Sequence, residues 1–340
     1  MAIRTRARRG AGGAATVKDV ARLAKVSAIT VSRALNAPDQ LSPATLERVK
    51  GAIASTGYVP NLLAGGLRSA KSRLVAAVVP TIAGPVFLET IQALTDALDE
   101  KGYQLMLGQS GYKTSREDAL LDAIIGRRPV GIVLTGMSHS AEARRRLAAS
   151  GIPVVETWDL SPDPIDMAIG FSHAGIGEAL CCYLHERGRR RPALISGDDE
   201  RARRRTTGFQ AAAKRLGMGD VPVIWVAAPT TLASGRAGLA ELLQRRPDLD
   251  AVGCSSDLLA LGVLTEAHAR GIAVPGGIAV AGFGNLAFSA GVIPSLTTVH
   301  VDGTRIGRTA ADYLIDRAEG RAIAQPILDV GFSIVRRDSA

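Results

Sequence analysis

The stretch TVKDVARLAKVSAITVSRALN, residues 16–36, decides the organisation of the N-terminal part of the chain. Thr16 is followed three residues later by Asp19, a spacing typical of a capping box, in which hydroxyl and carboxylate satisfy the free amides of a first helical turn. Ser27 is placed to cap a second helix, AITVSRALN. A tight turn through Lys25 and Val26 joins the two helices. The pattern predicts a helix-turn-helix.

A third helix follows in the same segment. Ser42 and Pro43 open the stretch PATLERVKGAIAST, and Gly57 is placed to end it. Each of the three helices carries one apolar stripe, which predicts a small shared core. The stripe residues are Val20, Ala21, Val31, Leu35, Leu46, Val49 and Ile53. Residues 16–60 are therefore predicted to form a small all-α domain.

The segments on either side of this domain differ from it. Residues 1–15 contain Arg, Gly and Ala without periodicity, so we expect a disordered basic arm, which either solubilises the chain or contacts phosphates. After it, YVPNLLAGGLRSAK, residues 58–71, predicts a linker, and we place the connection between domains at 61–72.

From residue 73 onward, short Val/Ile/Leu runs alternate with amphipathic helical stretches, which predicts parallel sheets covered on both faces. The runs are LVAAVVP, YQLMLGQS, GIVLTG, IPVVETW, DMAIGF, PALISG, VPVIWVA, AVGCSS, IAVAGFG and LTTVHV. These are too many strands for one compact sheet with short connections. We expect two doubly wound subdomains: an N-subdomain of about 73–170 and 300–328, and a C-subdomain of about 171–299 and 329–340. A ligand cleft is expected beyond the carboxyl ends of the strands.

Composition limits the classes of function. The chain has 340 residues, 46% of them hydrophobic, and a formal net charge of +9, which favours a polyanionic partner without naming it. Cys181, Cys182 and Cys254 have neither disulfide nor metal-ligand spacing and are predicted to be small core residues, so no metal or cofactor is expected. No apolar segment follows the basic start and no run reaches membrane-spanning length. We expect a cytoplasmic protein without a membrane partner.

The second helix of a helix-turn-helix enters the major groove of DNA with its first residues facing base edges. Arg33 can bond guanine through two parallel hydrogen bonds, and apolar side chains can touch a thymine methyl group. The predicted DNA-contacting residues of this helix are Ser27, Ala28, Ile29, Thr30, Ser32, Arg33 and Asn36, with Thr30, Ser32 and Asn36 reaching phosphates. The alternative is a three-helix packing module that binds no DNA.

The elements V-x-D-V-A, V-S-x-x-T-V-S-R and G-Y-x-P-N occur here in this order. The chain from Thr16 to the C-terminus resembles the LacI/GalR family of bacterial repressors, and only the first fifteen residues fall outside the likeness. The resemblance implies a small all-α helix-turn-helix headpiece plus a periplasmic-binding-protein-like α/β domain of two doubly wound parallel-sheet subdomains. It also implies a homodimer that reads a pseudopalindromic operator.

The resemblance further implies that YVPNLLAGGLRS contains a hinge helix that folds on the operator. By position, Asn61 joins the DNA contacts, and Leu67 is the side chain that enters the minor groove and kinks the duplex. The departure from the family is Gly65-Gly66. Two glycines inside a helix cost roughly 1 kcal/mol each relative to alanine, so this hinge helix is expected to be unstable without DNA.

Within the family, the chain is most similar to the gluconate-utilisation repressors. The family's effector contacts fall, by position, at Phe87, Thr135, Trp158, Arg205, Ser256, Asp257, Gly284 and Asn285. Arg205 offers a planar donor fork that suits a carboxylate or paired hydroxyls. Ser256 stands where Asn is usual and Gly284 where an acid often binds sugar hydroxyls, and a missing carboxylate suits an anionic ligand. The resemblance thus implies gluconate or a close sugar acid, acting as inducer.

Several of these residues have simpler interpretations. Arg205 lies in an arginine run that is typical of a solvated helix start. Phe87 and Trp158 also suit a plain core, and Asp257 is placed to be an N-cap that shapes the pocket. A different sugar, a sugar phosphate or a purine remains an alternative effector.

Two other classes of protein fit the sequence less well. Gly175-Ile176-Gly177 after DMAIGF resembles a phosphate-binding turn, but Leu180 occupies the third glycine position, and P-loop, zinc-protease and nucleophile-elbow motifs are absent from the sequence. We therefore predict no catalytic residues. A solute-binding protein without a regulatory role is the other alternative, and the N-terminal helices argue against it.

Overall fold

The computed structural model describes residues 15–59, 72–112 and 114–340. The chain divides into two compact units, residues 1–72 and 73–340. Most of the expected basic arm and hinge, with Asn61, Gly65, Gly66 and Leu67, lies outside the described residues.

The first unit contains the three predicted helices, α1 (Val17–Ala24), α2 (Ala28–Asn36) and α3 (Pro43–Thr56), with a 3₁₀ turn η1 (Pro38–Gln40) between the last two. The capping box at Thr16 is present, and the side chain of Ser27 accepts from the Thr30 amide at 3.1 Å. Ser42 caps α3 in the same way. The predicted helix starts are confirmed because each depends on a side chain reaching an amide three residues away.

The core of this unit is made of Val20, Ala21, Ala24, Val31, Val49 and Ala52. Two residues of the predicted stripe do not belong to it: Leu35 is 38% exposed, and Leu46 is half-buried. Helix α2 packs against α1, η1 and α3, and Leu35, near its C-terminus, lies on a side that these elements leave exposed.

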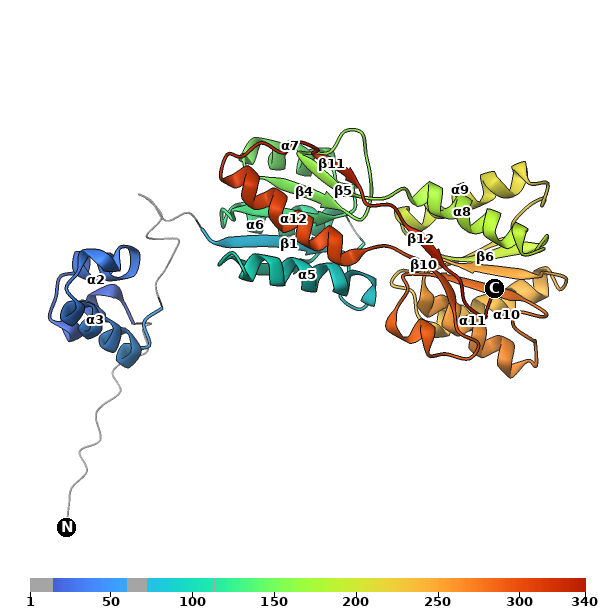
Figure 1. Cartoon of the computed structure of the whole chain (residues 1–340), viewed down its shortest axis with the longest axis horizontal. Helices are drawn as coiled ribbons and strands as arrows, with labels where there is room; N and C mark the ends of the chain where they lie inside the picture. The colour runs from blue at the N-terminus through green and yellow to red at the C-terminus, as the bar shows by residue number, and fades with distance from the viewer. Residues whose placement is uncertain (1–14, 60–71, 113) are drawn as a thin grey trace, which may run out of the picture. The chain divides into compact units, whose positions relative to one another are not determined.

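The second unit begins with a six-stranded parallel sheet of order β11-β5-β4-β3-β1-β2 (Figure 1). Its strands are β1 (Leu74–Val79), β2 (Gln104–Gln109), β3 (Gly131–Thr135), β4 (Val154–Thr157), β5 (Met167–Gly170) and β11 (Ile327–Asp329). Its helices are η2 (Pro85–Phe87), α5 (Leu88–Asp99), α6 (Thr114–Ile125), α7 (Ala141–Ser150) and α12 (Gly303–Ala318). We call this half the N-subdomain.

The other half, the C-subdomain, has the order β12-β10-β9-β8-β6-β7. Its strands are β6 (Pro192–Gly197), β7 (Val223–Val226), β8 (Ala251–Cys254), β9 (Ala279–Phe283), β10 (Thr297–His300) and the antiparallel β12 (Ser333–Val335). Its helices are α8 (His173–Glu186), α9 (Glu200–Arg215), α10 (Leu232–Arg245), α11 (Asp257–Ala269) and η3 (Ala287–Ala290). All ten predicted strands are present, and β11 and β12 are additional.

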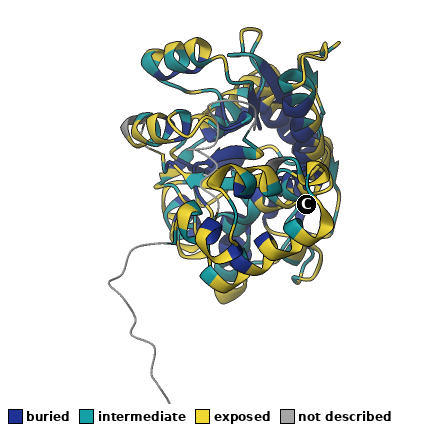
Figure 2. Cartoon of the chain, turned by 90° about the vertical axis from the view of Figure 1, so that its left-hand side faces the viewer, coloured by how far each residue is buried: buried dark blue, intermediate teal, exposed yellow. Residues whose placement is uncertain are grey.

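Side chains alternate between the two faces of each sheet, as strand geometry requires. In β1, Val75 and Ala77 pack with α5 and α12, whereas Ala76 and Val78 pack with α6 and α7. In β6, Ile195 faces α10 and α11 while Leu194 faces α8 and α9. Figure 2 shows the strands in dark blue and the outer helix faces in yellow. The predicted doubly wound fold is confirmed in both halves.

The chain passes between the two sheets three times within residues 73–340: after β5, after β10 and after β11. Before the last of these passages, α12 returns to the N-subdomain and covers the same sheet face as α5 (Figure 1). The carboxyl ends of β1, β3 and β4 on one side, and of β6 and β8 on the other, lead into loops that line the space between the subdomains.

Candidate functional site

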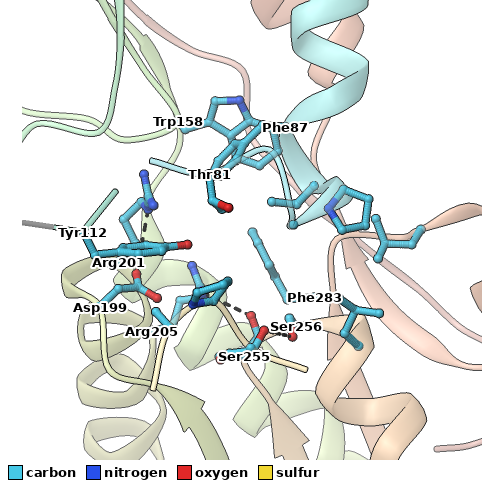
Figure 3. Close-up of a pocket in the computed structure, with 18 of the residues that line it drawn as sticks. Thr81, Phe87, Tyr112, Trp158, Asp199, Arg201, Arg205, Ser255, Ser256 and Phe283 are labelled. Carbon is cyan, nitrogen blue, oxygen red and sulfur yellow. Dashed lines mark hydrogen bonds and ion pairs between the residues drawn. The ribbon is translucent and has the colours of Figure 1, made fainter. Parts of the chain in front are cut away.

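The loops at these strand ends surround a cleft of about 700 Å³, a volume that includes space open to solvent. Small-molecule sites commonly fall in the range of about 300–1,000 Å³. The N-subdomain contributes Thr81, Phe87, Tyr112 and Trp158, and the C-subdomain contributes Asp199, Arg201, Arg205, Thr230, Ser255, Ser256 and Phe283. In Figure 3, Thr81, Phe87 and Trp158 lie on the upper wall, and Arg205, Ser255 and Ser256 lie on the lower one.

The N-subdomain wall is aromatic. Phe87 and Trp158 meet edge to face, with ring centroids 5.1 Å apart and planes at 86°. The indole Nε1 of Trp158 donates to Oγ1 of Thr90 at 3.1 Å, which fixes the ring. Both rings are buried, as expected for core residues, and both also line the cleft, as expected for ligand contacts. The two predictions for Phe87 and Trp158 therefore do not exclude each other.

A relay of hydrogen bonds joins the two walls. Nε2 of His173 donates to the Trp158 carbonyl at 2.9 Å, so Nδ1 carries no proton and accepts from Nη1 of Arg205 at 2.9 Å. Burial, followed by the positive charges of Arg205 and Arg201, places the pKa of His173 well below its usual value. The imidazole is therefore neutral and holds Arg205 in a fixed orientation.

Arg205 has two further contacts. Nη2 donates to the Ser255 carbonyl at 3.2 Å, and the guanidinium lies 4.2 Å from the centre of the Phe283 ring. Burial lowers the pKa of Arg205 to about 10, so the group stays charged at neutral pH. Its Nε is buried and has no hydrogen-bond partner among the described residues.

Arg201 lies four residues earlier on α9 and shares the cleft. Its Nη1 is 3.4 Å from the Thr135 carbonyl, its Nε is 3.9 Å from Oδ1 of Asp199, and its guanidinium lies 5.2 Å from the centre of the Phe87 ring. Asp199 caps α9 by accepting from the Ala202 amide at 3.1 Å. The sequence-based prediction missed Arg201, although the i, i+4 spacing to Arg205 places both on one helix face.

Hydroxyl groups line the C-subdomain wall. Ser256 is the N-cap of α11, and its Oγ lies 2.8 Å from Oγ1 of Thr230. Oγ of Ser255 accepts from the Gly197 amide at 2.8 Å. Because hydroxyls both donate and accept, this wall can match the hydroxyls of a ligand.

Asp257, Gly284 and Asn285, predicted to contact the effector, are not among the described residues that line this cleft. Asp257 is fully buried, and its carboxylate accepts from the Leu286 amide, Ser289 and Thr298, so it fixes the loop after β9. The N-cap is Ser256, one residue earlier, which corrects the predicted role of Asp257.

The backbone explains the positions of the other two. Gly284 has φ +126° and Asn285 has φ +47°, so the chain turns sharply after β9. Oδ1 of Asn285 accepts from Nη2 of Arg337 at 2.7 Å. A Cβ at Gly284 would lie 3.4 Å from Cγ2 of Val86, which lines the cleft, so a longer side chain there would enter its rim.

Thr135 lines an adjoining pocket, which shares Tyr112, Asp199 and Arg201 with the cleft. His139 also lines this pocket, with Nδ1 2.5 Å from Oε1 of Glu117 and Nε2 3.4 Å from Oε1 of Glu156. Burial lowers the pKa of His139, but hydrogen bonds and attraction to the two carboxylates outweigh burial and raise this pKa to about 9. The protonated ring joins the end of β3 to α6 and β4.

The first unit presents a different surface. Along α2, Ala28, Ile29, Ser32 and Arg33 are exposed, and Ile29 is 71% exposed although it is apolar. Thr30 is half-buried, and its hydroxyl is bonded to that of Ser27 at 2.9 Å. The side chain of Asn36 lies outside the described part of the chain. The outward face of α2 thus combines apolar and charged side chains that a DNA groove can accept.

Among the described residues, no group of three or more His, Cys, Asp and Glu could hold a metal ion, and no helix is long and apolar enough to cross a membrane. Cys181 and Cys254 are buried as predicted, and Cys182 is half-buried.

Known proteins similar to this chain are transcriptional regulators. Residues 16–61 match the model of bacterial regulatory proteins of the lacI family, and residues 182–340 match a periplasmic binding protein-like domain. The transcriptional regulator GntR of Pseudomonas aeruginosa is 36% identical over 96% of both chains. GntR of Escherichia coli is 31% identical, covering 94% of this chain and 96% of its own.

Solved structures agree. A LacI-family regulator from Silicibacter pomeroyi superposes with a TM-score of 0.90 at 33% identity, covering 96% of this chain and 99% of its own. The regulator GntR from Chromobacterium violaceum has a TM-score of 0.75 at 36% identity, covering 78% of this chain and 98% of its own. The predicted family and fold are confirmed: the chain belongs to the LacI family and is a DNA-binding transcriptional regulator.

Proposed function

We propose that this regulator is a homodimeric repressor whose operator affinity is lowered by a sugar acid, gluconate or a close relative, bound in the cleft. The observation that carries the proposal is the charge of the cleft. Two arginines, Arg201 and Arg205, line it, and Asp199 is the one carboxylate among its described lining residues. A buried cation without a full partner favours an anionic ligand, because the pairing offsets the lost hydration of the charge.

The remaining lining groups suit a polyhydroxy chain. Thr81, Thr230, Ser255 and Ser256 supply hydroxyls, and the rings of Phe87 and Trp158 supply an apolar surface for carbon-bound hydrogens. Small-molecule sites typically combine such an apolar surface with a few placed polar groups. The names of the relatives called GntR agree with a gluconate ligand.

Cross-cleft contacts connect the ligand site to the arrangement of the subdomains. Besides the His173 relay, Nη1 of Arg204 bonds the carboxylate of Asp159 at 2.9 Å, and Ser138 bonds Glu200. A ligand that touches both walls changes the balance of these contacts and so favours one arrangement. A preference of about 3 kcal/mol for the arrangement that cannot bind DNA weakens operator binding roughly a hundredfold, by reciprocal linkage.

The DNA side of the proposal rests on α2. One short recognition helix covers a half-site, so two copies related by a two-fold axis are needed to read a pseudopalindrome. We expect Ala28, Ile29 and Arg33 to face base edges, with Ser27, Thr30, Ser32 and Asn36 near phosphates. Sedimentation should show a dimer, and a monomer that protects a full palindrome would contradict this.

Calorimetry with gluconate, glucose, glucose 6-phosphate and a purine tests the effector. We expect gluconate to give the tightest binding, and in a gel-shift titration we expect it to release the protein from its operator. Arg205→Ala should stay on the operator at high gluconate. Binding of glucose or a purine without binding of gluconate would refute the sugar-acid proposal.

A further inference from the structure

The two cleft arginines differ in how much of their hydrogen-bonding capacity the protein already uses. Both terminal nitrogens of Arg205 have protein partners, His173 at 2.9 Å and the Ser255 carbonyl at 3.2 Å. The Phe283 ring covers the guanidinium plane, and Nε is buried. A carboxylate in the fork geometry needs two neighbouring N–H groups of one guanidinium aimed at it. Arg205 thus has one N–H on each terminal nitrogen already bonded within the protein, and its Nε–H, which has no partner among the described residues, is buried.

Arg201 is in the opposite situation. Its one hydrogen bond to the described residues, to the Thr135 carbonyl, is long at 3.4 Å, and its nearest carboxylate, Asp199, is 3.9 Å away. That carboxylate already accepts from the Ala202 amide. Yet the Arg201 side chain is only 14% exposed. It is a largely desolvated cation that is positioned by the Phe87 ring and weakly paired.

The neighbouring arginines do not share this condition. Arg203 pairs with Asp198 and lies 4.6 Å from the centre of the exposed Trp225 ring. Arg204 pairs with both Asp159 and Glu200. Of the arginines at the start of α9, Arg201 and Arg205, which face the cleft, therefore lack a close carboxylate partner. Of these two, Arg201 has the guanidinium edge that a ligand can engage.

We propose that Arg201 recognises the anionic group of the effector, whereas Arg205, held by His173 and Ser255, orients hydroxyl groups. The assignment rests on the function proposed above and gives the two arginines of the cleft different roles in binding the effector. It also gives the anion a place between the subdomains. Arg201 is anchored on α9 of the C-subdomain, but its guanidinium contacts Thr135 and Phe87 of the N-subdomain. An anion bound to the Arg201 guanidinium would therefore lie where the C-subdomain and the N-subdomain meet.

The test compares gluconate with gluconamide, its neutral amide, by calorimetry on the full chain. Wild type is expected to prefer the acid by about tenfold or more, the effect of one charge-assisted hydrogen-bonded pair. Arg201→Gln should bring the two affinities within about threefold of each other, mainly by weakening the acid. Arg205→Gln should weaken both ligands and keep the preference. Arg203→Gln, on the same helix but outside the cleft, is the matched control and should behave as wild type.

Thermal melting shows whether each variant is folded. Arg201→Lys is the second variant if Arg201→Gln does not fold, because it keeps the charge and loses the fork, and it should retain part of the acid preference. An undiminished preference in either Arg201 variant, or its loss in Arg205→Gln alone, overturns the assignment. Equal binding of acid and amide by wild type overturns it too. If wild type binds neither compound, the proposed sugar-acid effector fails instead.

Discussion

Replacing Gly177 by alanine is expected to loosen the packing of α8 against α9, the helix that carries Arg201 and Arg205. Helices α8 and α9 are packed so closely that a Cβ at Gly177 would lie 1.9 Å from the Arg205 carbonyl oxygen and 2.7 Å from the Phe209 amide. The first distance is about 1.5 Å short of an ordinary contact of 3.4 Å. Both atoms belong to the backbone, so no side chain can move aside. The helices must separate, and α9 must shift.

Overpacking of a core costs about 1–3 kcal/mol, and a clash between backbones belongs at the upper end. Urea denaturation should therefore show Gly177→Ala to be less stable than wild type by about 2–3 kcal/mol. Because the clashing carbonyl is that of Arg205, effector affinity should fall as well, by calorimetry. The control is Gly276→Ala, where the nearest heavy atom would be a side-chain carbon at 3.5 Å. A Gly177→Ala protein within 0.5 kcal/mol of this control would refute the packing argument.

Three other substitutions test separate parts of the chain. Arg33→Ala should lose about 1–3 kcal/mol of discrimination between operator and random DNA in gel-shift titrations, and an equal loss on both would remove its base-reading role. Gly51→Ala should stabilise the helical domain of residues 16–60 by about 0.5–1 kcal/mol, measured by calorimetric melting of that domain, since a Cβ on α3 at this position meets nothing within 4 Å. His139 has a folded-state pKa of about 9, above its unfolded value near 6.5, so its contribution to stability is full below pH 6.5 and is lost as pH rises towards 9. Between pH 6.5 and 9, the unfolding free energy of wild type should fall more steeply with pH than that of His139→Gln, and the two slopes should differ by at most about 1.4 kcal/mol per pH unit. Equal slopes for wild type and variant would contradict the assigned pKa.

The sequence predicted those features that depend on local or periodic signals. The caps at Thr16, Ser27 and Ser42 each act over three residues, so their sequence spacing sufficed. The ten strands were visible as buried apolar runs. The short edge strands β11 and β12 were not predicted, because none of their residues is fully buried and they leave no run of buried apolar residues.

The cleft was predicted less completely, for a physical reason. Phe87, Trp158, Arg205 and Ser256 line it as the family positions imply. Whether Arg201 or Arg205 is available to a ligand depends instead on partners from other elements, such as His173 on α8 and Thr135 on β3. Such partners meet only in the folded chain. The role of Asp257 was misjudged for the same reason, because its partners lie 29 to 41 residues away.

The late position of α12 in the sequence affects how the N-subdomain folds while the chain is being synthesised. Strands β1 to β5 are complete by residue 170, but the helix that buries Val75, Ala77, Val133 and Val155 together with α5 begins only at residue 303. During synthesis of the intervening 132 residues, one apolar face of the first sheet lacks α12 and has α5 alone to cover it. Uncovered faces of this kind promote aggregation of nascent chains. The C-subdomain, whose strands β6 to β10 lie between β5 and α12 in the sequence, can therefore assemble most of its sheet before this face of the N-subdomain is covered.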